Sequence, residues 1–74
     1  MLSNTEKMVM AFVKYATHVR TCTVNDVVAA TGLSANEAER ILGNLVTKNE
    51  LFVQGFDYDS DNNQLRFYWL TSDL

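Results

Sequence analysis

The sequence has 74 residues, which suffices for one domain with one small hydrophobic core and leaves no room for a second domain among these residues. Six Lys and Arg against nine Asp and Glu give a net charge of −3 at pH 7, whereas a nucleic-acid-binding domain usually presents a basic face to the phosphates. The single cysteine, Cys22, excludes an internal disulfide and a cysteine-based metal cluster, so we expect it to be a small buried residue.

The N-terminal segment is predicted to form a helix over residues 4–18. Ser3 and Glu6 are spaced as a capping box, in which a hydroxyl and a carboxylate each bind a backbone N–H at the start of a helix. The first residues lack the features of a secretory signal, and no apolar run is long enough to span a bilayer. We therefore expect a cytoplasmic protein without membrane contact. Apolar residues at helical spacing are expected to face the core: Met8, Val9, Ala11, Phe12, Tyr15 and Ala16.

A second helix is predicted over residues 24–31, after a short extended connection. Thr23 and Asp26 repeat the capping-box spacing at its start. Residues 19–23 are expected to be extended and to pair with an edge of a later hairpin. Gly32 marks the end of this helix, because glycine readily adopts the left-handed conformation found at helix C-termini.

A third helix is predicted over residues 35–48, and with the second it forms a helix-turn-helix. Ser34 and Glu37 give a third capping-box pattern. When the residues are plotted at about 100° each, one broad face of this helix is apolar. That face is expected to pack inward, and it consists of Ala38, Ile41, Leu42, Leu45 and Val46.

The opposite stripe of this helix has the chemistry of a DNA-reading surface. Arginine can bind both acceptors of guanine, asparagine can form two hydrogen bonds with adenine, and glycine lets the backbone approach a groove wall. Any surface helix carries a polar stripe, however, so this pattern alone does not separate the two interpretations. The predicted base-reading residues are Asn36, Arg40, Gly43, Asn44 and Thr47, and Lys48 is predicted to touch phosphate.

A β-hairpin is predicted over residues 51–57 and 64–70, because the apolar pattern changes to a period of two after residue 50. Asn62 and Asn63 suit the turn, since asparagine tolerates a positive φ. Both faces of the hairpin carry large apolar side chains, and a domain this small covers only one face with its own helices. The other face is either covered by the first helix or the C-terminal residues, or exposed as a protein-interaction surface. Its predicted members are Phe52, Phe56, Phe67 and Trp69.

Three carboxylates, those of Asp57, Asp59 and Asp61, occur at the hairpin turn. Their spacing matches the start of an EF-hand calcium loop. Asn62 occupies the glycine position of that loop, and Tyr68 occupies the position of its bidentate glutamate. A solvated acidic turn is therefore the favoured interpretation, and we expect no metal or other cofactor. The sequence also contains no catalytic motif, so no enzymatic activity is predicted.

The order of these elements resembles the winged helix-turn-helix superfamily. The likeness rests on the Thr-Gly-Leu-Ser turn of residues 31–34, on Arg40, on Leu51 at the start of the first wing strand, and on the Tyr-Trp-Leu-Thr run of residues 68–71. It implies an α+β fold of three helices and a C-terminal hairpin wing. Asn49 stands where the family usually has glycine, a tolerable change because asparagine also adopts the left-handed conformation.

The resemblance implies two alternative functions. The first is a small DNA-binding transcription regulator, similar in size to those of bacterial fimbrial and plasmid operons, which reads double-stranded DNA with helix 35–48. The second is a protein-interaction module that uses the aromatic wing face and does not bind DNA. The acidic wing tip favours the second, because carboxylates repel phosphate. A weak homodimer through the wing face, tightening as salt rises, is also predicted.

Overall fold

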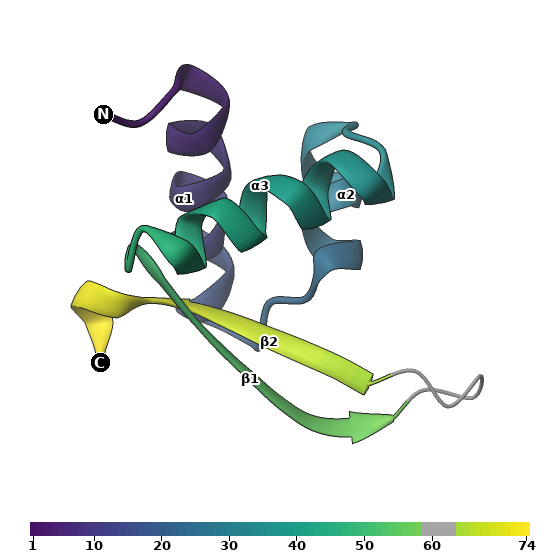
Figure 1. Ribbon diagram of the computed structural model, residues 1–74. Helices are drawn as coiled ribbons and strands as arrows, with labels where there is room; N and C mark the ends of the chain where they lie inside the picture. The colour runs from purple at the N-terminus through teal and green to yellow at the C-terminus, as the bar shows by residue number, and fades with distance from the viewer. Residues whose placement is uncertain (59–63) are drawn as a thin grey trace.

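Three helices are followed by an antiparallel hairpin and a short 3-10 turn (Figure 1). This computed structural model describes residues 1–58 and 64–74. The predicted α+β architecture with a winged helix-turn-helix layout is confirmed. The first and third helices each end one residue before the predicted bound, and the first strand ends one residue after it. The elements are α1 (Asn4–Thr17), α2 (Val24–Thr31), α3 (Ala35–Thr47), β1 (Leu51–Tyr58), β2 (Gln64–Leu70) and η1 (Thr71–Asp73).

The first two helices begin with complete capping boxes. The Ser3 backbone N–H donates to the Glu6 carboxylate at 2.9 Å, and the Glu6 N–H donates to the Ser3 hydroxyl at 3.0 Å. Thr23 and Asp26 make the same exchange at the start of α2, at 2.9 and 3.4 Å. Each box satisfies backbone donors that have no partner within the helix, and it places a carboxylate at the positive end of the helix dipole.

The predicted capping box at the start of α3 is only half formed. The Ser34 hydroxyl accepts a hydrogen bond from the Glu37 N–H at 3.1 Å. The Glu37 carboxylate instead binds the guanidinium of Arg40, one turn further along the helix. A cationic donor binds a carboxylate more strongly than a neutral N–H does. The expectation of a reciprocal box at Ser34 was therefore wrong, although Ser34 does cap the helix.

Two residues with a positive φ end the helices of the helix-turn-helix. Gly32 follows α2 with φ at 77°, and its N–H donates to the Val28 carbonyl at 3.0 Å. Asn49, just after α3, has φ at 62°. This left-handed geometry is available to glycine without cost and to asparagine more readily than to most residues. The left-handed conformation expected of Asn49 is confirmed.

The hydrophobic core lies where the three helices meet the inner face of the hairpin. Of the five α3 residues predicted to face inward, four are buried and Val46 is partly buried, as predicted. Cys22 is also fully buried, as predicted. The core residues are Val9, Val13, Ala16, Cys22, Val27, Ala38, Ile41, Leu42, Leu45, Leu51, Tyr68 and Leu70.

α1 buries only part of the side predicted to face the core: Val9 and Ala16 are buried and Phe12 is partly buried, as expected. Val9 and Val13 are fully buried, whereas Met8, Ala11 and Tyr15 are exposed. The predicted inward set was wrong for these three residues. Apolar residues surround much of α1, so helical periodicity alone does not select one side. Packing against β2 and the other helices selects the side that contains Val13.

The hairpin places alternate residues on its two faces. Leu51 pairs with Leu70 on the inner face, and Phe52 pairs with Trp69 on the outer face. The register shifts between Gly55 and Asp57, so simple alternation does not continue through this part of β1.

The connection between α1 and α2 touches one edge of the hairpin. The Tyr68 N–H of β2 donates to the Cys22 carbonyl at 2.9 Å. One backbone hydrogen bond thus confirms the predicted contact of residues 19–23 with a hairpin edge. It ties the start of the helix-turn-helix to the wing. Val19 and Arg20 are not extended as expected, because their N–H groups donate to the Ala16 carbonyl in a turn at the end of α1.

Several predictions concern residues outside the described part of the chain. These are the acidic turn at Asp59 and Asp61 and the turn residues Asn62 and Asn63. The side chains of Phe56 and Asp57 are outside it as well. Within residues 1–58 and 64–74, no group of three His, Cys, Asp or Glu side chains is arranged to hold a metal ion. No helix in these ranges combines the length and apolar character needed to cross a bilayer.

Candidate nucleic-acid interface

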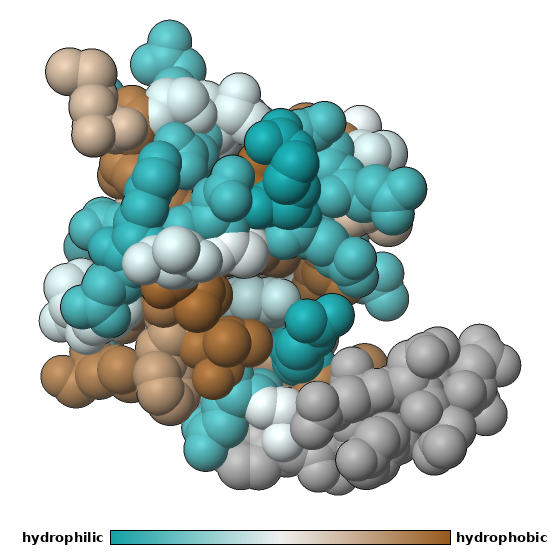
Figure 2. All heavy atoms as spheres, in the orientation of Figure 1, coloured by the Kyte–Doolittle hydropathy of each residue, from teal (hydrophilic) through white to brown (hydrophobic). Residues whose placement is uncertain are grey.

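The outer stripe of α3 faces solvent along the whole helix. Its five members, all predicted from the sequence to read base edges, are exposed. In Figure 2 the face over α3 is hydrophilic, with pale patches among the polar side chains. Because α3 lies on the outside of α1 and α2, a flat or convex ligand can reach the stripe (Figure 1). The members of this stripe are Asn36, Arg40, Gly43, Asn44 and Thr47.

Gly43 lies in the middle of the stripe, and no packing contact explains why this position is a glycine. A Cβ built at this position meets no atom within 4 Å, so the fold does not need a glycine here. Glycine in a helix interior is less stable than alanine by about 0.8–1 kcal/mol. A small residue at an exposed mid-helix site is what close approach of another molecule to the backbone requires.

Arg40 and Glu37 form an ion pair at one edge of the stripe. The Arg40 side chain is 63% exposed and that of Glu37 is 41% exposed. An exposed pair of this kind contributes about 0–1 kcal/mol, because water and salt screen both charges. The guanidinium can therefore exchange Glu37 for a base or a phosphate at little cost.

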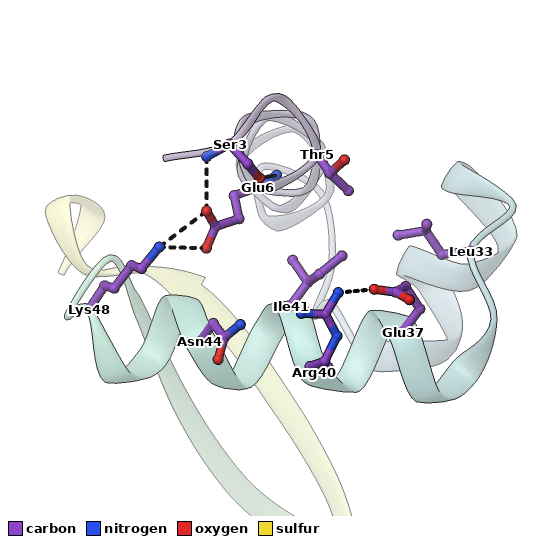
Figure 3. A pocket seen from close by; sticks show the side chains of 9 residues that line it. All are labelled: Ser3, Thr5, Glu6, Leu33, Glu37, Arg40, Ile41, Asn44 and Lys48. Atoms are coloured by element: carbon purple, nitrogen blue, oxygen red, sulfur yellow. Dashed lines mark hydrogen bonds and ion pairs between the residues drawn. The ribbon is translucent and has the colours of Figure 1, made fainter. Parts of the chain in front are cut away.

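A groove of about 540 Å³ runs between the N-terminal end of α1 and α3 (Figure 3). Arg40, Asn44 and Lys48 form part of its α3 side, so the groove borders the outer stripe. Glu6 and Lys48 point toward one another across it. The residues that line it are Ser3, Thr5, Glu6, Leu33, Glu37, Arg40, Ile41, Asn44 and Lys48.

The Glu6 carboxylate holds the Lys48 ammonium. Lys48 Nζ lies 2.9 Å from Glu6 Oε2 and 3.2 Å from Oε1. Glu6 is only 8% exposed. The backbone N–H of Ser3 and then the ammonium of Lys48 lower the pKa of this carboxyl below its ordinary value of 4.5. Lys48, predicted to contact phosphate, is thus bound to a carboxylate of its own chain.

Most cationic side chains are paired with acids. Four of the six form ion pairs in the described part of the chain, joining Arg20 to Asp26, Arg40 to Glu37, Lys48 to Glu6 and Arg66 to Glu39. Lys7 and Lys14 form no ion pair with any described residue, and they belong to α1 and not to the outer stripe of α3. The cations are therefore not gathered on the face that was predicted to meet DNA.

Three aromatic side chains of the hairpin, those of Phe52, Phe67 and Trp69, lie together on its outer face. The Trp69 ring centroid lies 6.1 Å from that of Phe52 and 6.3 Å from that of Phe67. Phe52 is 39% exposed, and the other two rings are partly buried. The structure brings these three predicted interaction residues together. The fourth predicted member, Phe56, has its side chain outside the described part of the chain.

Cys22 and Tyr68 are both buried, and a backbone hydrogen bond joins them. Burial raises the pKa of the Cys22 thiol to about 11. Burial also raises the pKa of the Tyr68 hydroxyl above its ordinary value. Both groups stay protonated at neutral pH, and a protonated buried thiol is a poor nucleophile.

Sequence reasoning did not find the role of Glu6. Its place in the Ser3 capping box was predicted, but its partner Lys48 lies 42 residues away. No local pattern reports such a contact.

No protein-family model and no curated protein matches this chain.

Proposed function

We propose that this protein binds double-stranded DNA and acts as a small cytoplasmic transcription regulator, with α3 in the major groove. In helix-turn-helix proteins the second helix of the motif enters this groove and its outer residues contact base edges. Here α3 holds that place and presents an exposed stripe without an acidic member. The mid-helix Gly43, which the fold does not require, is the observation that carries the proposal.

The stripe residues are assigned distinct roles. Arg40 binds a guanine edge after leaving Glu37, and Asn36 and Asn44 bind adenine or phosphate. Gly43 allows the helix backbone to approach the groove, and the methyl group of Thr47 contacts a thymine methyl group. Lys48 is assigned to holding α1 through Glu6, so it contributes less to phosphate binding than its position in the sequence suggests.

The test is a fluorescence-anisotropy titration with duplexes enriched from a randomised library. Arg40→Ala is expected to weaken binding to an enriched site by about 1–3 kcal/mol, the range for one bidentate base contact. Lys14→Ala is the matched control, because it also removes one cation but lies on α1. Equal losses in the two variants, or failure to enrich any site at low salt, would contradict the proposal.

A second function, a protein-interaction module that uses the wing, is favoured by the aromatic cluster. Phe52 remains 39% exposed beside Trp69, and Figure 2 shows apolar side chains gathered below α3, over the start of the hairpin. A two-fold axis could bury identical clusters against one another and give a weak homodimer. Sedimentation equilibrium should then show association of the wild type that increases with salt and that Trp69→Ala reduces. A wild type that stays monomeric at high protein concentration would remove the homodimer.

A further inference from the structure

The exposed side of α1 carries a small apolar surface flanked by two lysines. At about 100° per residue its members fall within roughly a third of the helix circumference. Met8 is 45% exposed and Tyr15 is 73% exposed, and Ala11 lies between them. Val19, in the turn just past the end of the helix, is 79% exposed as well. We call this set the α1 outer face; its helical members are Lys7, Met8, Ala11, Lys14 and Tyr15.

The charge of the α1 outer face is opposite to that of the whole protein. Lys7 and Lys14 are exposed, and within residues 1–58 and 64–74 neither forms an ion pair. The one acidic residue of α1, Glu6, lies on the other side of the helix and is bound to Lys48. A chain with a net charge of −3 thus presents a face with two free cations and no acid.

The shape of this face suits a helix. Ala11 is flanked by Met8 three residues before it and Tyr15 four residues after it, so larger side chains stand on both sides of a small one. Helices pack by placing the ridge of one into such a depression of the other. Met8 also has the flexible, polarizable side chain that adapts to different partners.

A second copy of this chain is a poor occupant. If two α1 helices packed antiparallel across a two-fold axis at Ala11, Lys7 of each copy would lie beside Lys14 of the other. Like charges brought together in this way are destabilising. The occupant should instead carry acidic side chains at the positions that face the two lysines.

We propose that the α1 outer face binds an α-helix of a partner protein, one that presents acidic side chains beside an apolar ridge. The apolar ridge packs over Ala11 between Met8 and Tyr15, and the acidic side chains pair with Lys7 and Lys14. Because Glu6 faces α3 from the other side of α1 (Figure 3), this surface points away from the α3 groove. The partner and a ligand on α3 can therefore bind at the same time.

The test uses two designed helical peptides with the same Leu and Ala ridge, one flanked by Glu and the other by Lys. NMR titration of isotope-labelled protein should show shifts of α1 amides with the Glu peptide only. Replacing both lysines, Lys7→Gln with Lys14→Gln, should weaken the binding by roughly two- to thirty-fold, the range for losing two exposed ion pairs. The matched control is Asn36→Asp with Asn44→Asp, which changes the net charge equally but on α3.

Several results would overturn this proposal. One is silence of the α1 amides with the Glu peptide up to about 1 mM, and another is equal binding of both peptides. Equal weakening by the α3 control would mean that only net charge matters. Binding to vesicles of phosphatidylglycerol and phosphatidylcholine, with α1 shifts and no peptide binding, would assign the face to a membrane. Loss of DNA affinity in the lysine variant, as large as that of Arg40→Ala, would assign it to DNA.

Discussion

Glu6 and Lys48 join the first and third helices, although 42 residues separate them in the chain. The carboxylate of Glu6 caps α1 through the Ser3 N–H and binds the ammonium of Lys48, just after α3, at 2.9 Å. One side chain thus fixes the start of one helix and the end of another. Because α3 is the proposed DNA-reading helix, this contact also fixes its position relative to α1.

Glu6→Gln is expected to destabilise the fold at neutral pH and to remove part of its pH dependence. The pKa of Glu6 is lowered in the folded state, so the ionised carboxylate stabilises the fold above the ordinary pKa of 4.5, and this contribution is lost as the pH falls through the lowered value. Urea unfolding at pH 7 should therefore show a lower midpoint for the variant. The difference from wild type should shrink at acid pH.

Glu39→Gln is the matched control for this change. Glu39 also faces a cation, but its side chain is 50% exposed, and its Oε1 lies 3.9 Å from Nη2 of Arg66. An exposed pair at that distance contributes little, so the control should unfold close to the wild type at both pH values. If the two variants lost the same stability at pH 7, Glu6 would have no special role in joining the helices.

The Cys22 thiol is expected to react with thiol reagents only when the protein unfolds. It is fully buried, and burial raises its pKa to about 11, so the thiolate is scarce and inaccessible at pH 7–8. Labelling by a disulfide reagent should be slow in buffer and fast in denaturing urea. The labelling rate should also rise in Glu6→Gln, because that variant opens more often. Rapid labelling of the native protein would show that the α1–α2 connection opens locally.

Local patterns in the sequence predicted much of the fold. A hydroxyl residue followed three places later by an acid located the start of each helix, because capping involves neighbours in the chain. Asn49 was correctly assigned a left-handed geometry for the same reason. The change of period after residue 50 located the hairpin, since side-chain alternation is a property of the strand itself.

Contacts between residues far apart in the chain could not be predicted from the sequence. Lys48, predicted to contact phosphate, pairs with Glu6, and Val13 is buried on α1 whereas Tyr15 is exposed. Both outcomes depend on how α1 packs against α3 and β2, which no periodicity reports. Sequence patterns also failed at short range, because two neighbours, Arg40 and the Ser34 N–H, compete for the Glu37 carboxylate and the pattern does not show which one binds it.

The salt dependence of DNA binding is expected to be shallow. Only Arg40 and Lys48 offer cationic groups along α3, and both begin in ion pairs. Each phosphate contact contributes about −0.9 to the slope of log Kobs against log salt concentration. A titration across salt concentrations should therefore give a slope no steeper than about −2. A slope of about −5 or beyond would mean that another surface of the protein grips the phosphates.

Gly43→Ala is expected to stabilise the protein and weaken DNA binding at once. The added methyl group meets no atom within 4 Å, and alanine is favoured over glycine in a helix interior by about 0.8–1 kcal/mol. The urea midpoint should rise accordingly, whereas affinity for an enriched duplex should fall because the methyl group stands between the helix backbone and the groove wall. Gly32→Ala is the contrasting control: its φ of 77° disfavours a side chain, so stability should fall without a direct effect on the α3 stripe. A Gly43→Ala protein that is more stable and binds DNA as tightly as the wild type would leave this glycine without a function, and the proposal for α3 would lose its main support.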